Sequence, residues 1–131
     1  MTMTDQEVNE KFWNSVKERA LQLPYCSRCG KVFFYPRAIC PACWSEVTEW
    51  RQLGGRGTVW AHSTVRFPLL RGEWEKRVPY IVALVDLPEG VRLLSNIVDC
   101  PPEEVRIGMA VELTYQERDG QVLYLFRPAK N

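Results

Sequence analysis

The chain lacks a long apolar run, a surplus of charge of either sign, and more than one histidine. No apolar run approaches the ~18 residues that a membrane-spanning helix requires, so we expect no membrane span. The 17 basic and 16 acidic residues give a formal net charge of +1, which provides no broad attraction to nucleic acid or to a membrane surface. The N-terminal residues contain no apolar core like that of a secretory signal peptide, so the cytoplasm is the expected location.

Groups that carry out catalysis are also scarce. His62 is the single histidine, and no neighbouring motif supplies the partner that a general base needs. Cys100 precedes two prolines and has no motif that would stabilise a thiolate. The glycines at positions 54, 55 and 57 lack the Gly-Lys-Ser/Thr ending of a phosphate-binding loop. We therefore expect that the chain is not an enzyme by itself.

Two Cys-x-x-Cys pairs are the most informative feature that is present: Cys26 with Cys29, and Cys40 with Cys43, ten residues apart. Four thiolates complete the tetrahedron that Zn²⁺ prefers and leave no open position for water or substrate. Iron in the same four sulfurs, as in rubredoxin, is the alternative metal. Two disulfides are disfavoured, because the total of five cysteines is odd and no secretory signal is seen. The pattern predicts a structural zinc site.

A helix is predicted over the first segment, residues 1–24. Thr4 and Glu7 fit a capping box at its start, and Pro24 is expected to end it. Two alternatives remain for its apolar face: it packs on the rest of the chain, or it docks a partner subunit through Phe12 and Trp13. The apolar positions recur every four residues and are Val8, Phe12, Val16 and Ala20.

The remaining sequence predicts a mainly β protein in two parts. Residues 25–53 form the metal ribbon, with one short strand at 32–35 between the cysteine pairs. Residues 54–131 predict five strands with a helical turn at 101–108 between the third and the fourth, which is the order of an OB-fold barrel. The predicted strands are 58–67, 80–87, 91–98, 110–117 and 121–127.

Taken together, these pieces resemble a known family that pairs a rubredoxin-like zinc ribbon with an OB-fold. The family was long labelled a domain of unknown function and is associated with acyl-CoA metabolism of lipids or aromatic acids. The resemblance covers nearly the whole chain, including Phe12-Trp13 on the first helix. The segments that carry it read CSRCGKVFFYPRAICPAC, GRGTVWAHSTV, PYIVALVDLPEGVRLLSNIV, IGMAVELTY and FRPA.

The resemblance implies a non-catalytic accessory subunit in a hetero-oligomer. Members of the family act as small partners of thiolase-like enzymes or of MaoC-like hydratases, and the enzyme partner carries the catalytic residues. The small partner is thought to complete or extend the acyl-CoA pocket. We expect a thiolase-like partner first and an enoyl-CoA hydratase second.

The loop at residues 66–77 is the candidate contact for acyl-CoA or the partner. Acyl-CoA carries phosphates and an adenine ring, so the rim of its pocket needs cations beside aromatic surface. In OB-folds the loop between the first two strands often lines the ligand face. A solvated charged loop is the alternative. The candidate residues are Arg66, Arg71, Trp74, Lys76 and Arg77.

Binding of single-stranded nucleic acid is a competing hypothesis, because zinc ribbons and OB-folds both do this elsewhere and aromatic side chains can stack on bases. The near-neutral charge weighs against it, since contacts to a phosphate backbone need clustered cations. A stand-alone acyl-CoA enzyme is the third hypothesis, and the few catalytic groups weigh against that one.

Overall fold

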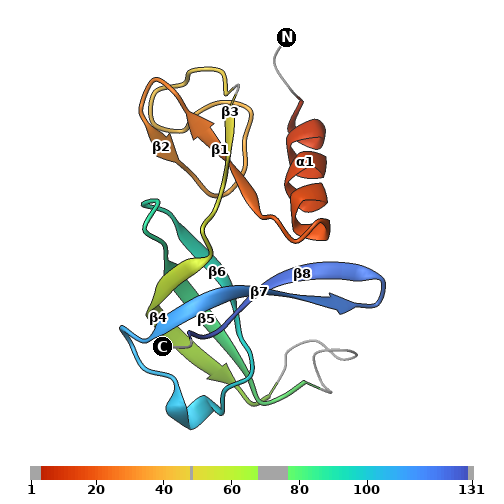
Figure 1. Cartoon of the computed structure of the whole chain (residues 1–131), viewed down its shortest axis with the longest axis vertical. Helices are drawn as coiled ribbons and strands as arrows, with labels where there is room; N and C mark the ends of the chain where they lie inside the picture. Colours follow the sequence, from red (N-terminus) through yellow and green to blue (C-terminus); the bar gives the residue numbers. More distant parts are fainter. Residues whose placement is uncertain (1–3, 48, 68–76, 130–131) are drawn as a thin grey trace.

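The computed structural model describes residues 4–47, 49–67 and 77–129. A ribbon and one helix lie side by side above a β-barrel (Figure 1). The helix is α1 (Asp5–Lys17), and the ribbon contains β1 (Gln22–Cys26), β2 (Lys31–Val32) and β3 (Glu49–Gln52). The barrel contains β4 (Arg56–Val65), β5 (Tyr80–Asp86), β6 (Arg92–Ile97), the 3₁₀ turn η1 (Pro102–Glu104), β7 (Ala110–Arg118) and β8 (Gln121–Pro128).

The barrel is closed, with the strand order β4-β5-β6-β8-β7, and β7 pairs with β4 to complete the ring. All of its pairs are antiparallel except β6 with β8, which meet in parallel at Ile97 and Phe126. The η1 turn lies between β6 and β7, as the sequence predicts. The prediction of a mainly β protein with a five-stranded OB barrel is confirmed.

Alternation along the strands builds the barrel core. In β5, Ile81, Ala83 and Val85 are buried and the residues between them are only partly covered. Leu93 on β6 and Phe126 on β8 are fully buried and belong to the same core cluster. Side chains in a strand point alternately to its two faces, so one face of each strand fills the barrel.

Gly57 on β4 marks a place where the barrel wall has no room for a side chain. A Cβ there would lie 2.6 Å from Val85 Cγ1 and 2.8 Å from the backbone oxygen of Asp86. The backbone oxygen cannot rotate away, so β5 itself must shift. We expect Gly57→Ala to lower the free energy of unfolding by about 1–3 kcal/mol in urea denaturation. Gly54→Ala is the control, because its Cβ meets only Glu89 Oε2, at 3.6 Å. Equal losses in both variants would show that crowding is not the cause.

The helix starts as predicted and ends earlier. The capping box is present: Glu7 N donates to Thr4 Oγ1 (3.1 Å) and Thr4 N donates to Glu7 Oε1 (3.2 Å). The helix stops at Lys17, and the expectation that it runs to Pro24 is wrong. Pro24 lies inside β1, whose backbone pairs with β3. A proline is unsuited to the interior of a helix, because its ring clashes with the preceding turn. No helix in the described ranges has the length and apolar content needed to cross a bilayer.

Phe12 joins the helix to the other two parts of the molecule. Its ring centroid lies 5.9 Å from that of Tyr124 on β8 and 6.1 Å from that of Phe34 in the ribbon. The side chain is 1% exposed, so it has no surface to offer a partner, and the expected partner contact at Phe12 is wrong. Of the two alternatives for the apolar face of the helix, Phe12 follows the first, which is packing on the rest of the chain. Trp13 is half-buried and keeps part of its surface.

The ribbon is a three-stranded sheet in the order β2-β1-β3. The strand predicted at residues 32–35 is shorter than expected, since pairing covers only Lys31–Val32. The chain enters the ribbon along β1 and leaves along the antiparallel β3, with Gln22 opposite Gln52. Leu53 N donates to Leu21 O (2.9 Å) just beyond this pair. The two connections to the ribbon therefore lie next to each other.

Candidate metal centre and the surrounding surface

The same turn is built twice around the cysteines. After the first pair, Gly30 N donates to Cys26 O (2.7 Å), and Gly30 has φ +70°. After the second pair, Trp44 N donates to Cys40 O (2.9 Å), and Trp44 has φ +65°. Glycine adopts positive φ without steric cost, whereas a tryptophan there is strained by roughly 1–2 kcal/mol. Each turn directs two sulfurs toward the same point.

The four sulfur atoms lie within 4.8 Å of one another. The Sγ atoms of Cys26 and Cys43 are 3.6 Å apart, and those of Cys29 and Cys40 are 4.0 Å apart. An ion bound tetrahedrally at about 2.3 Å from each sulfur needs sulfur–sulfur distances of about 3.8 Å. A disulfide needs about 2.05 Å. The structure thus brings together the four ligands that the sequence predicts, in a geometry that suits an ion and not two disulfides.

The surroundings of the sulfurs make the four thiols ionise unequally. Ser45 Oγ lies 3.3 Å from Cys43 Sγ, and this hydroxyl lowers the pKa of the Cys43 thiol to about 6. The neutral thiol of Cys43 donates to Ser45 Oγ, and Arg28 Nη1 donates to the same oxygen (3.4 Å). Hydrogen bonding to Cys43, followed by burial, raises the pKa of Cys29 to about 12. The cluster thus ionises readily at Cys43 and resists further ionisation, and a bound divalent cation supplies the charge that allows four thiolates.

Of the predicted contact residues in the loop at 66–77, the structure describes two. Arg66 is exposed just after β4. Arg77 is half-buried and lines a hollow of about 390 Å³ at the end of the barrel, together with Tyr80, Asn96, Cys100 and Arg118. Arg71, Trp74 and Lys76 lie outside the described residues. The hollow therefore has two guanidinium groups, Arg77 and Arg118, in its lining.

The described residues contain no pair of nucleophile and base. His62 is exposed on β4, and its imidazole forms no hydrogen bond or ion pair within the described residues. Burial, and then the charge of Glu104, raise the pKa of the Cys100 thiol, so this cysteine is protonated near neutral pH. A protonated thiol is a poor nucleophile.

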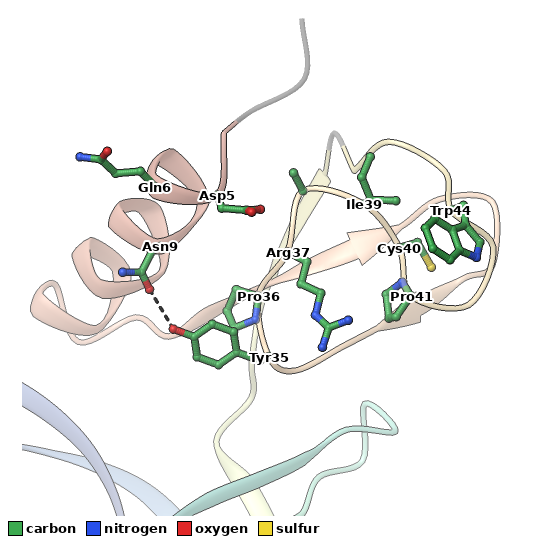
Figure 2. A pocket seen from close by; sticks show the side chains of 11 residues that line it. Asp5, Gln6, Asn9, Tyr35, Pro36, Arg37, Ile39, Cys40, Pro41 and Trp44 are labelled. Atoms are coloured by element: carbon green, nitrogen blue, oxygen red, sulfur yellow. Dashed lines mark hydrogen bonds between the residues drawn. The ribbon is translucent and has the colours of Figure 1, made fainter.

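A groove with a volume of about 740 Å³ lies between α1 and the ribbon, and it was not predicted from the sequence (Figure 2). Its floor comes from alternate residues of one ribbon segment, Pro36, Ala38 and Cys40, which are all buried. Its opposite wall is the first half of α1. The only sequence signal was a tryptophan directly after the second cysteine pair, and nothing in the sequence placed the helix beside it.

A four-sulfur ribbon followed by a closed five-stranded OB barrel defines the class to which the chain belongs. Two family models match it in this order. The rubredoxin-like zinc ribbon domain of ChsH2 matches residues 13–49, and the C-terminal OB-fold domain of ChsH2 matches residues 50–116. The chain belongs to the ChsH2 family of zinc-ribbon and OB-fold proteins, whose members are also described as DUF35 proteins.

Its relatives include proteins of similar length and subunits of larger enzymes. The chain is 38% identical to a DUF35 domain-containing scaffold protein of Methanocaldococcus jannaschii, covering 92% of this chain and 91% of the relative. It is 32% identical to the benzoylsuccinyl-CoA thiolase subunit BbsA of Thauera aromatica, covering 78% and 72%. It is 35% identical to a probable enoyl-CoA hydratase alpha subunit of Thermomonospora curvata, covering 90% of this chain but 37% of that subunit.

A solved structure agrees over nearly the whole length. One chain of the Ltp2-ChsH2(DUF35) aldolase superposes with a TM-score of 0.81 at 32% sequence identity. The match covers 92% of this chain and 93% of the other. Because the match spans nearly all of both chains, the overall fold is shared with that chain of the Ltp2-ChsH2(DUF35) aldolase.

Proposed function

We propose that this chain is a non-catalytic accessory subunit that binds a thiolase-like enzyme and helps to form or extend its acyl-CoA pocket. The observation that carries the proposal is the sequence likeness of 92% of the chain to a scaffold protein and of 78% of it to a thiolase subunit. The described residues of this chain offer no nucleophile with a base, which is what an accessory role requires.

The metal in this proposal is a structural Zn²⁺, with iron as the substitute that the same sulfurs accept. Cys26, Cys29, Cys40 and Cys43 would hold it. With four protein ligands the ion has no position for substrate, so its role is to hold the ribbon in shape beside α1.

The hollow at Arg77 supports a contact with CoA. Arg77 and Arg118 in its lining are suited to phosphate groups, which guanidinium binds through paired hydrogen bonds. Arg66 lies at the other end of the same loop, and its exposed side chain is open to solvent. In the proposal, Arg71, Trp74 and Lys76 add cations and an aromatic surface from the same loop.

The choice of partner rests on how much of each relative the chain spans. It spans 72% of BbsA and 37% of the hydratase alpha subunit, so a thiolase-like partner is the first candidate. A MaoC-like enoyl-CoA hydratase is the second, because the likeness to the hydratase subunit covers 90% of this chain. Binding of single-stranded nucleic acid stays a weaker alternative, since the net charge of +1 offers little attraction to phosphates.

Co-expression with the thiolase-like enzyme encoded nearest to this chain tests the proposal. We expect a stable hetero-oligomer by size-exclusion chromatography with light scattering, and loss of most thiolase activity when this chain is omitted. A MaoC-like hydratase expressed in the same way is the comparison. A chain that stays monomeric beside both enzymes, each fully active alone, would contradict the accessory role.

A further inference from the structure

The groove between α1 and the ribbon exposes large apolar side chains around an apolar floor. Trp44 is 82% exposed, Tyr35 is 51% exposed and Ile39 is 37% exposed, and all three line the groove. The volume of about 740 Å³ lies within the range of sites that bind a ligand or peptide. Large apolar residues gathered around one hollow are typical of an interaction site, whereas single ones are common on any surface.

Two opposite charges line the same groove without pairing. Asp5 lies on the α1 side and Arg37 on the ribbon side (Figure 2). Neither forms an ion pair or a hydrogen bond with any residue in the described ranges, although salt bridges are formed elsewhere in the chain. Arginine, tryptophan and tyrosine are the residue types that contribute most to binding energy at interfaces, and all three line this groove.

The walls are held in place before anything binds. Tyr35 Oη donates to Asn9 Oδ1 across the groove (3.1 Å), which ties the ribbon to the helix (Figure 2). Cys40 contributes both a sulfur to the metal centre and a part of the groove floor. The metal centre therefore fixes the ribbon side of the groove, and a preorganised groove loses little entropy on binding.

Shape and charge decide between the possible occupants. In a symmetric pair of this chain, a two-fold axis at the groove would place one hollow against the other and leave both unfilled. An extended segment of polypeptide is narrow enough to enter the groove. Its apolar side chains would then pack against Pro36 and Ala38 on the floor. Charge complementarity requires an acidic side chain opposite Arg37 and a basic one opposite Asp5.

We propose that this groove receives an extended segment of the partner enzyme subunit, with apolar residues flanked by an acid that pairs with Arg37. This inference rests on the proposed accessory role and names the surface through which that role is exercised. The groove is separate from the hollow at Arg77, so docking and contact with CoA use different faces of the chain.

The test compares three variants in the complex with the co-expressed thiolase-like subunit. Arg37→Glu is expected to raise the dissociation constant at least about tenfold, because it removes the cation and repels the acid. Trp44→Gly is expected to weaken binding by a similar factor. Glycine suits φ +65°, so this variant keeps its metal and its fold. Lys31→Glu, with the same change of charge on the exposed side of β2, is the control and should bind within about twofold of the wild type.

A photo-reactive phenylalanine analogue in place of Trp44 then locates the segment. Mass spectrometry should identify one partner peptide that contains apolar residues and an acid. Reversing that acid to lysine should restore binding to the Arg37→Glu variant. This rescue requires direct pairing, and a merely misfolded ribbon would not show it.

The outcomes separate the inference from the proposed function. A stable complex that all three variants form equally well overturns the groove as the docking site and leaves the accessory role intact. Failure of the wild-type chain to form any complex overturns both. Self-association of the wild-type chain that Arg37→Glu abolishes would assign the groove to a second copy and overturn the inference.

Discussion

Replacing Cys29 by serine is expected to release the metal and unfold the ribbon while the barrel stays folded. The buried residues around the four sulfurs, Cys26, Cys40 and Val47, form a small cluster separate from the main core. So small a core cannot offset the conformational entropy of the segment without the ion, whose binding to such sites is worth roughly 10–16 kcal/mol. The barrel core contains none of the four ligands and therefore retains its packing.

Metal analysis and hydrogen exchange together measure this effect. The wild-type chain is expected to carry stoichiometric zinc, and the Cys29→Ser variant close to none. Amide protection should fall in the ribbon and persist in β4 to β8. Cys100→Ser is the matched control, because Cys100 lies outside the cluster of ligands and should not change the metal content. Stoichiometric zinc in Cys29→Ser would contradict four-thiolate ligation.

Replacing Phe12 by alanine is expected to cost about 3–5 kcal/mol in the free energy of unfolding. Phe12 is 1% exposed and its ring packs against Trp13, Phe34 and Tyr124. The substitution thus leaves a cavity where the helix, the ribbon and the barrel meet. A loss of this size is a large part of the stability of a typical small domain.

Urea denaturation followed by tryptophan fluorescence measures the loss at Phe12. The control is Phe67→Ala, since Phe67 is 90% exposed and should change stability by no more than about 0.5 kcal/mol. Phe12→Leu should recover most of the loss, because leucine refills part of the cavity. If both alanine variants lose the same amount, Phe12 does not form the junction described above.

Local signals in the sequence were sufficient for most of the barrel. Asp119 and Gly120 both have positive φ, at 52° and 79°, and they form the hairpin between β7 and β8 that the Asp-Gly pair predicts. The two prolines at the start of η1 and the alternation in β5 likewise correspond to the observed elements. The ligand spacing predicted the sulfur cluster, because a Cys-x-x-Cys turn needs only its own residues to direct both sulfurs to one point.

Features that depend on distant contacts were not predictable. The apolar positions of the first helix continue to Ala20, yet the helix ends at Lys17, and from Gln22 onward the chain pairs with β3. That pairing joins residues about thirty positions apart, which local periodicity does not encode. The groove depends in the same way on the meeting of α1 with a loop of the ribbon, through Tyr35 and Asn9.

The adjacent ends of β1 and β3 make the ribbon a detachable module. Gln22 and Gln52 are opposite each other in an antiparallel pair, so their Cα atoms are about 5 Å apart. A two-residue turn can span that gap, so the residues between them can be exchanged as a unit, provided that the replacement keeps the packing of Leu23 and Phe34 against the main core. Evolution can accordingly vary the ribbon while the barrel stays constant, and an engineer can graft a ribbon from a relative at the same two positions.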